Sequence, residues 1–358
     1  MTDYDRREFV GALGIGALGA LGAEKYLSGN GRAGAADANG TADPDNASIG
    51  NETDGDGTQD LPEGTSEWTE ADVPVEASLN DVVTAKDGLY AVGESGVVLH
   101  RESDGTWSTV VENGPYAAQN ELAGAAVTDN GGHVWFAGGS GALGVYKIPT
   151  GQVTDYSFPK EHTSSWSDVA VVGLAGSEWV FLVNSSGELF RGRMDAGSMT
   201  WADEVVEPGS GTTIPAICTD SNGFGYVADS SGAVYESVDG GKSWKKIGIK
   251  GNDGALYDIA ALGTHTIDVA GDDGHLFNFN GFRWDRRDIG QKTLYAVSRS
   301  RRDGVVAGEG GHVWEFTEDG WTEADSPTGA QLNGTTLGSS THPAVVVGGS
   351  STVLERQR

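Results

Sequence analysis

One pattern of apolar and polar positions recurs along most of this chain. It consists of an apolar strand, a small-residue turn containing glycine, a second apolar strand, another turn and then a tryptophan. The turn glycines are 45, 46, 45, 42 and 37 residues apart, and in the last copy Ser351 takes their place 40 residues after Gly311. These glycines are Gly96, Gly141, Gly187, Gly232, Gly274 and Gly311. The spacing predicts seven repeats of one structural unit.

Each repeat is expected to contain four strands. In the fifth copy these would be Leu256–Leu262, Thr266–Gly271, His275–Asn278 and Trp284–Asp288. The two middle strands are separated by Gly, Asp, Ser and Glu, which suit tight hairpin turns. Their nearly continuous apolar runs indicate strands that are covered on both faces. Four strands repeated about every 40 residues predict an all-β fold, a seven-bladed β-propeller. A pair of β-sandwiches would not repeat one pattern seven times, and a parallel β-helix has a shorter period.

The two ends of the repeat region share a short sequence. Trp-Thr-Glu-Ala-Asp occurs at residues 68–72, before the first copy, and again at residues 321–325, in the fourth strand of the sixth copy. The seventh copy stops after its third strand. We therefore predict that residues 67–73 supply the fourth strand of blade seven and close the ring, which leaves no open sheet edge at the seam.

A tryptophan is expected at the head of the fourth strand in most copies. Its burial contributes about 2–3 kcal/mol, and its spacing places it between neighbouring blades. We interpret it as a structural wedge, with a ligand-stacking platform as the alternative. The five residues concerned are Trp107, Trp201, Trp244, Trp284 and Trp321.

The first 35 residues resemble a twin-arginine export signal. Arg6 and Arg7 precede a weakly apolar stretch rich in Gly, Ala and Leu, at residues 11–23. This stretch is short and glycine-rich for a membrane span of about 20 residues. Such a signal is an address read by a receptor, so we expect export by the twin-arginine route to the cell surface or the medium. Membrane association would then occur only through an uncleaved signal.

Residues 36–66 contain almost no large apolar side chain. Such a segment cannot bury enough surface to offset its ordering entropy, so we expect a disordered acidic linker before a propeller at residues 67–358. Asn39, Asn46 and Asn51 each begin an acceptor triplet for N-glycosylation. Two further triplets begin at Asn184 and Asn333.

The chain is strongly acidic, with a net charge of −29 and an isoelectric point of about 4.4. This excludes nucleic acid and anionic lipid as partners of the surface as a whole, because polyanions are held by clustered Lys and Arg. The acidity is typical of adaptation to high salt, where self-repulsion is screened. A cationic partner is the alternative explanation. Cys218 is the only cysteine, so no intramolecular disulfide forms, and we expect it to be a small core residue of a monomer.

One turn carries a complete Asp-box. The segment Ser237-Val238-Asp239-Gly240-Gly241-Lys242-Ser243-Trp244 fits the pattern Ser-x-Asp-x-Gly-x-Ser/Thr-Trp, and degenerate copies occur at residues 103–107 and 318–321. Residues 67–358 therefore resemble the BNR/Asp-box propellers, in particular the photosystem II stability/assembly-factor-like proteins with YVTN/BNR-like repeats. The resemblance implies that the Asp-box is structural. Ser237, Asp239 and Ser243 would bind the hairpin, with Gly241 in the turn and Trp244 in the core.

The sequence shows no recognisable catalytic site. Sialidases share the Asp-box but need an arginine triad, a Tyr–Glu nucleophile pair and an Asp acid/base, and the Arg-Ile-Pro element of their catalytic domain is absent. Quinone-dependent dehydrogenase propellers have tryptophan-docking repeats that do not occur here. His275 and His312 occupy equivalent positions on separate strands, which argues against a shared metal. We expect no enzyme activity, cofactor or metal.

One region is basic. Residues 242–302 carry eleven basic and seven acidic side chains. The resemblance implies an arginine-bearing surface that holds a partner, and ordinary ion pairing is the alternative. The candidate patch consists of Arg286, Arg287, Arg299, Arg301 and Arg302. The sequence thus predicts a non-enzymatic scaffold that binds a protein or assembles a complex, with a surface glycan-binding module or a sialidase-like hydrolase as alternatives.

Overall fold

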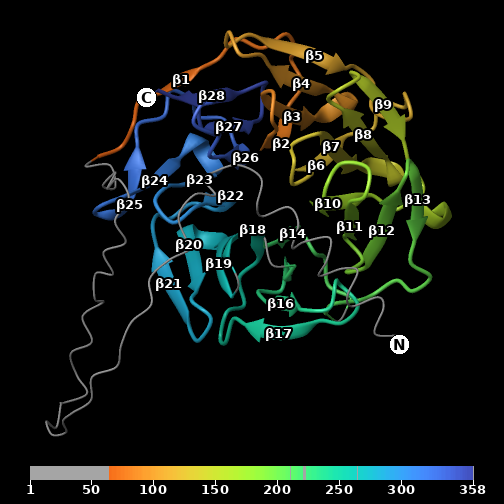
Figure 1. Cartoon of the computed structure of the whole chain (residues 1–358). Coiled ribbons are helices and arrows are strands. Elements are labelled where there is room, and N and C mark those ends of the chain that lie inside the picture. Colours follow the sequence, from red (N-terminus) through yellow and green to blue (C-terminus); the bar gives the residue numbers. More distant parts are fainter. Residues whose placement is uncertain (1–63, 210, 221–222, 264, 358) are drawn as a thin grey trace, which may run out of the picture. The chain divides into compact units, whose positions relative to one another are not determined.

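The computed structural model describes residues 64–209, 211–220, 223–263 and 265–357. The expected export signal with Arg6 and Arg7 lies outside the described residues, as do Asn39, Asn46, Asn51 and nearly all of the expected linker. The described part forms seven four-stranded antiparallel sheets. Figure 1 shows them arranged in a ring in chain order. The predicted seven-bladed β-propeller is confirmed.

The strands of each blade follow one another from the inside of the ring to the outside. Blade 1 contains β2 (Leu79–Thr84), β3 (Leu89–Gly93), β4 (Val98–Arg101) and β5 (Trp107–Val111). Blade 2 contains β6 (Leu122–Val127), β7 (His133–Gly138), β8 (Leu143–Lys147) and β9 (Gln152–Asp155). Blade 3 contains β10 (Trp166–Val172), β11 (Trp179–Asn184), β12 (Leu189–Asp195) and β13 (Ser198–Trp201). Blade 4 contains β14 (Ala216–Thr219), β15 (Gly225–Ala228), β16 (Val234–Ser237) and β17 (Lys245–Gly248).

The remaining blades have the same order. Blade 5 contains β18 (Leu256–Gly263), β19 (Thr266–Gly271), β20 (His275–Phe279) and β21 (Trp284–Asp288), so the strands expected in this repeat agree within one residue at each end. Blade 6 contains β22 (Leu294–Arg299), β23 (Gly304–Gly308), β24 (Val313–Thr317) and β25 (Gly320–Ala324). Blade 7 contains β26 (Leu332–Thr336), β27 (Val345–Gly348) and β28 (Val353–Arg356), and its outer strand is β1 (Trp68–Glu70). The described helices are the short 3-10 turns η2 (Glu94–Gly96), η3 (Gly139–Gly141), η4 (Pro159–Glu161), η5 (Asp272–Gly274) and η6 (Glu309–Gly311).

Ring closure follows the predicted route. β1 pairs antiparallel with β28, with Trp68 opposite Arg356 and Glu70 opposite Leu354. Two further backbone bonds of 2.8 Å extend this pairing, from the Ala71 amide to the Val353 carbonyl and from the Gln357 amide to the Glu67 carbonyl. The start of the repeat region therefore completes the last blade, and Figure 1 shows β1 beside β28.

The antiparallel order of the strands gives the ring two distinct faces. The turns between the first and second strands of a blade, and between its third and fourth strands, lie on one face. Because β1 begins and β28 ends there, we call it the terminal face. The opposite face carries the turn between the second and third strands and the connections between blades, and we call it the connection face.

The glycine in the turn between the second and third strands has a steric cause. Gly96, Gly141, Gly274 and Gly311 all have φ between 74° and 81°. A Cβ atom on Gly311 would lie 2.0 Å from the Thr328 carbonyl oxygen in the connection that follows blade 6. Glycine is therefore required at this position because the neighbouring connection packs directly against the turn.

Apolar clusters fill the spaces between adjacent blades. Trp68 is only 4% exposed and packs against Val305, Val313 and Leu354, on blades 6 and 7. Trp107 packs in the same way between blades 7 and 1, which agrees with the wedge interpretation. The strand position differs in three copies, since Trp321 is the second residue of β25, Trp201 ends β13 and Trp244 precedes β17 by one residue.

Candidate functional site

The basic segment predicted from the sequence does not form one surface. Arg286 and Arg287 are adjacent in β21, so their side chains point to opposite faces of blade 5. Arg286 lies opposite Phe277 and lines a cavity that faces blade 4. Arg287 lies opposite Leu276, which packs against blade 6, and its guanidinium lies next to Gly320 in the β24–β25 turn. The expectation that the two arginines share a patch is therefore wrong.

Arg299 is not a surface residue. Its side chain is 9% exposed, and its Nε lies 3.4 Å from Oδ2 of the buried Asp268 on blade 5. Its guanidinium carbon lies 3.5 Å from the centre of the Phe316 ring, and its Nη1 donates to the Asp303 carbonyl at 2.8 Å. Arg299 thus joins blades 5 and 6, and this ordinary ion pairing corrects its assignment to a docking patch.

The terminal face of blades 4 to 6 carries the other exposed candidates. Arg301 and Arg302, in the β22–β23 turn, are exposed and form no side-chain hydrogen bond or ion pair with any described residue. Phe282, in the β20–β21 turn, is 96% exposed, and Val238, in the β16–β17 turn, is 53% exposed. The Arg299–Asp268 pair joins blade 6 to blade 5 beside these turns. We call Val238, Phe282, Arg301 and Arg302 the docking surface.

Sequence reasoning missed the apolar part of this surface. A single Phe in the turn Asn280-Gly281-Phe282-Arg283 carries no periodic signal, so it does not stand out from the strands. Its position in a tight turn is itself the signal, because a turn of two to four residues cannot fold a large side chain back into the core. The side-chain oxygen of Asn280 accepts from the amides of Phe282 and Arg283 at 3.1 and 3.0 Å and holds the turn in shape.

The Asp-box residues hold the β16–β17 turn. Oδ1 of Asp239 accepts from the amides of Lys242 and Ser243 at 3.0 and 2.9 Å, and Oδ2 accepts from the Ser243 hydroxyl at 2.6 Å. Ser237 accepts from the Gly241 amide at 2.9 Å. These bonds outweigh burial and lower the pKa of Asp239. The side-chain oxygens of Ser237, Asp239 and Ser243 all take part in these bonds, so this geometry serves structure.

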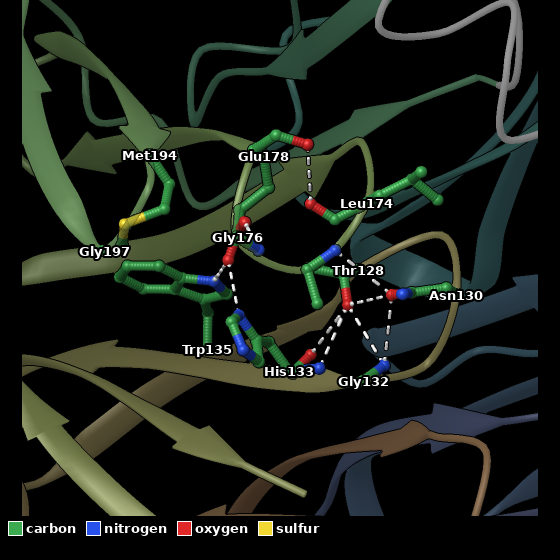
Figure 2. Close-up of polar contacts among 12 residues, drawn as sticks. Thr128, Asn130, Gly132, His133, Trp135, Leu174, Gly176, Glu178, Met194 and Gly197 are labelled. Carbon is green, nitrogen blue, oxygen red and sulfur yellow. Dashed lines mark hydrogen bonds and ion pairs between the residues drawn. The ribbon is translucent and has the colours of Figure 1, made fainter. Parts of the chain in front are cut away.

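A buried carboxylate joins blades 2 and 3 on the terminal face. Glu178 is fully buried, and its Oε1 lies 2.7 Å from Nδ1 of His133 and accepts from the Trp135 indole at 3.1 Å. Figure 2 shows Glu178 reaching these two residues, with Thr128 and Asn130 binding the neighbouring turn. Burial alone would raise the pKa of Glu178, but the bonds from His133, the backbone and Trp135 lower it. The network is saturated and leaves no group for substrate.

Three aspartates line the central channel, which holds a cavity of about 440 Å³. Asp81, Asp168 and Asp258 occupy the same position on blades 1, 3 and 5. Each accepts at 2.7 Å from the amide that follows it and at 2.7–2.9 Å from an amide on the next blade. Burial raises the pKa of Asp81 to about 7 and that of Asp258 to about 6, and it raises that of Asp168 as well. These carboxylates join blade 1 to blade 2, blade 3 to blade 4, and blade 5 to blade 6.

Other residues noted in the sequence have structural positions. His275 and His312 pair with Asp288 and Glu323 on the outer strands of their own blades. Burial raises the pKa of the Cys218 thiol, which packs against the core between blades 4 and 5. Within the described ranges, no group of three or more His, Cys, Asp or Glu side chains is placed to hold a metal ion. Over the same ranges, no helix is long and apolar enough to cross a bilayer.

The Asn184 triplet is inaccessible. Its side chain is fully buried, with Oδ1 accepting from the amides of Ser186 and Glu188 at 3.0 Å. Asn333 is half-buried and donates through Nδ2 to the Leu79 carbonyl at 2.9 Å, which joins blades 7 and 1. Both asparagines thus take part in the structure.

Comparison with known proteins gives a likeness of fold. No protein-family model matches the chain, and no curated protein sequence does. The structure of YCF48 from Cyanidioschyzon merolae is 17% identical with a TM-score of 0.63, covering 81% of this chain and 98% of that one. YCF48 bound to D1 peptide is 12% identical with a TM-score of 0.64, covering 84% of this chain and 98% of that one. Virginiamycin B lyase from Staphylococcus aureus is 11% identical with a TM-score of 0.65, covering 81% and 98%.

These identities show the fold alone. The propeller resembles that of YCF48, so the β-propeller fold implied by the sequence resemblance is confirmed. The lyase shows that the same architecture also occurs in an enzyme. Function must therefore be argued from the surface of this chain.

Proposed function

We propose that this protein is a non-enzymatic scaffold that binds a protein partner through the docking surface. The observation that carries the proposal is Phe282, an almost fully exposed aromatic side chain on the same face as two arginines without ion-pair partners. An exposed aromatic residue costs solvation free energy unless it is covered. Aromatic residues and arginines also contribute most of the binding free energy in protein interfaces.

The charge of the docking surface defines the partner. Arg301 and Arg302 stand out on a chain of net charge −29, so they would attract a carboxylate-bearing segment locally. Phe282 and Val238 would contact apolar side chains of the same segment. The solved complex of YCF48 with D1 peptide supports a peptide-binding role for this fold. We propose a partner segment that combines acidic and apolar residues.

The described residues favour binding over hydrolysis. A sialidase-like site needs three arginines directed at one substrate carboxylate. Here Arg101, Arg299 and Arg356 are each held by carboxylates of a neighbouring blade. We further propose that the protein is exported by the twin-arginine route and works at high salt as a monomer. The paired arginines near the N-terminus and the acidity of the chain support this.

Crosslinking mass spectrometry on intact cells tests the proposal. The Phe282→Ser variant and the Arg301→Gln/Arg302→Gln variant should each lose most crosslinks to the partner, while both keep the unfolding midpoint of the parent protein because the altered side chains are exposed. Tyr116→Ser is the matched control, since Tyr116 is 55% exposed on the connection face. An unchanged set of crosslinks in both docking-surface variants, or the same loss in the Tyr116 variant, would refute the proposal.

A further inference from the structure

A groove opens on the connection face between blades 4 and 5. It has a volume of about 540 Å³. Its floor is aromatic and apolar, formed by Phe277, Trp284 and Ile249. The connection between β17 and β18 forms one wall, and the turn η5 with β21 forms the other. Its walls lie toward the opposite end of the blades from the docking surface, and Trp284 reaches it from the start of β21.

The register of blade 5 fixes which side chains reach the groove. Phe277 lies opposite Arg286, and Phe279 lies opposite Trp284, so all four point toward blade 4. The Trp284 indole stacks on the Phe279 ring, with 5.0 Å between the ring centroids, and its Nε1 donates to the Ile247 carbonyl at 2.9 Å. The stacking contact on one face and the hydrogen bond at the edge hold the Trp284 indole in place, so the floor is rigid.

The walls carry charged side chains of both signs. Lys250 and Arg286 contribute positively charged donors, and Asp253 and Asp273 contribute carboxylate acceptors. Lys250, Asp253 and Asp273 are exposed and have no hydrogen bond or ion pair to any residue that the structure describes. The Arg286 side chain is 55% exposed, and its Nε lies 3.1 Å from Oδ1 of Asp288, so other N–H groups of the guanidinium remain for a ligand. Three charged groups thus line one groove without partners of their own.

This combination selects the class of ligand. An anion would meet Asp253 and Asp273, and a cation would meet Lys250 and Arg286, so a net charge of either sign is disfavoured. A hydroxyl group both donates and accepts, so it complements both kinds of wall residue. The flat apolar face of a sugar ring would stack on the partly exposed Trp284 indole, since Phe277 and Ile249 are buried. We infer that the groove between blades 4 and 5 binds a neutral saccharide.

Saccharide binding here is separate from the proposed partner binding on the terminal face. The two sites share no residue, and they lie on opposite faces of the ring. A protein with both could hold a partner while attached to a neutral glycan. Each site can also fail without the other, because Phe282→Ser should leave glycan binding intact and groove variants should leave partner crosslinks intact.

Titration of the full chain with neutral oligosaccharides tests the inference. The probes are hexaoses of glucose, mannose, galactose and N-acetylglucosamine, followed by saturation-transfer difference NMR and by tryptophan fluorescence. Asp273→Asn and Arg286→Gln should each weaken binding about tenfold or more, because each removes a charged hydrogen-bonding group. Asn tolerates the left-handed backbone of Asp273, φ 54°, so the turn should be kept.

Arg287→Gln provides the matched control. It makes the same change in charge at the next residue of the same strand, but on the side that faces blade 6. Saturable binding that Arg287→Gln preserves and the two groove variants weaken would support the inference. Binding of none of the four hexaoses at millimolar concentration would overturn it, as would equal weakening by all three variants or a preference for sialylated over neutral glycans.

Discussion

Removing the side chain of Trp68 should open the ring at its seam. Trp68 is the largest apolar side chain of the short strand β1, and 4% of it is exposed. Replacing a buried Trp by Ala typically costs about 3–5 kcal/mol through lost burial and the cavity that remains. This is a large part of the total free energy of unfolding of about 5–15 kcal/mol. The β1–β28 pairing spans only three residue pairs, so local opening should precede global unfolding.

Native-state hydrogen exchange measures this opening directly. Since 1.4 kcal/mol corresponds to a factor of ten, the Trp68→Ala variant should exchange the amides of β1 and β28 about a hundredfold or more faster. The Ala71 and Gln357 amides are suitable probes, because they donate across the seam to the Val353 and Glu67 carbonyls at 2.8 Å. Urea denaturation should show a lower free energy of unfolding, and deletion of residues 67–73 should lower the melting temperature further.

The matched control is Trp201→Ala. Trp201 lies at the end of the outer strand of blade 3 and packs against the core between blades 2 and 3. This change should destabilise the protein while leaving the exchange of β28 unchanged below the global unfolding limit. If Trp68→Ala left the protection of β28 at the parent level, or if Trp201→Ala exposed β28 equally, the seam would not depend on this side chain.

Three further predictions concern buried polar groups. The folded pKa values of Asp81 and Asp258, about 7 and 6, lie above the unfolded value of 3.8, so their contribution to stability should be complete below pH 4 and fall as pH rises toward 7. The Asp81→Asn variant should therefore show a flatter pH dependence of the melting temperature. The control Asp72→Asn, at an exposed position, should leave this pH dependence unchanged. Glu178→Gln should cost about 1–3 kcal/mol at neutral pH, because one of its buried donors loses a carboxylate oxygen, and the difference from the parent in urea denaturation should shrink as pH falls through the lowered pKa of Glu178. Asn184 should carry no glycan in the folded protein, since its amide is buried, and intact-glycopeptide mass spectrometry checks this.

The fold was predictable because its signals are local and repeated seven times. Hairpin turns need residues that accept positive φ, and inner strands need continuous apolar runs, so both features occur in the sequence of every repeat. The seam was predictable because Trp68 and Trp321 sit in the same five-residue sequence. Aligning the repeats with one another therefore identified residues 67–73 as the missing strand, because they resemble the fourth strand of the sixth repeat.

The candidate site was harder to predict because it depends on the direction in which each side chain points and on contacts with residues distant in the sequence. Adjacent strand residues such as Arg286 and Arg287 face different blades, so sequence proximity does not make a patch. The burial of Arg299 requires Asp268, which comes from the preceding blade. The aspartates of the channel did leave a signal, since Asp81, Asp168 and Asp258 each follow the first residue of their strand by two positions. That signal is visible only when the inner strands are aligned.

Ion pairs hold β28 of blade 7 against both neighbouring blades. β1 and β25 share their sequence, so apolar burial alone does not distinguish the edges that they could pair with. Glu355 of β28 accepts from Nε and Nη2 of Arg101 at 2.7 and 2.8 Å and from the Trp107 indole at 2.8 Å. On the other flank, Arg356 binds both oxygens of Asp303 on blade 6.

Bidentate pairs of this kind are specific in geometry, although burial offsets much of their net energy. They tie blade 7 to both of its neighbours, at the place where the ring lacks a covalent connection. Glu355 and Arg356 lie directly opposite Thr69 and Trp68, so the residues that bind the neighbouring blades also sit in the register of the closing strand. Apolar burial of Trp68 therefore stabilises the closing strand, and the arginine–carboxylate pairs fix the position of β28, the strand with which it pairs.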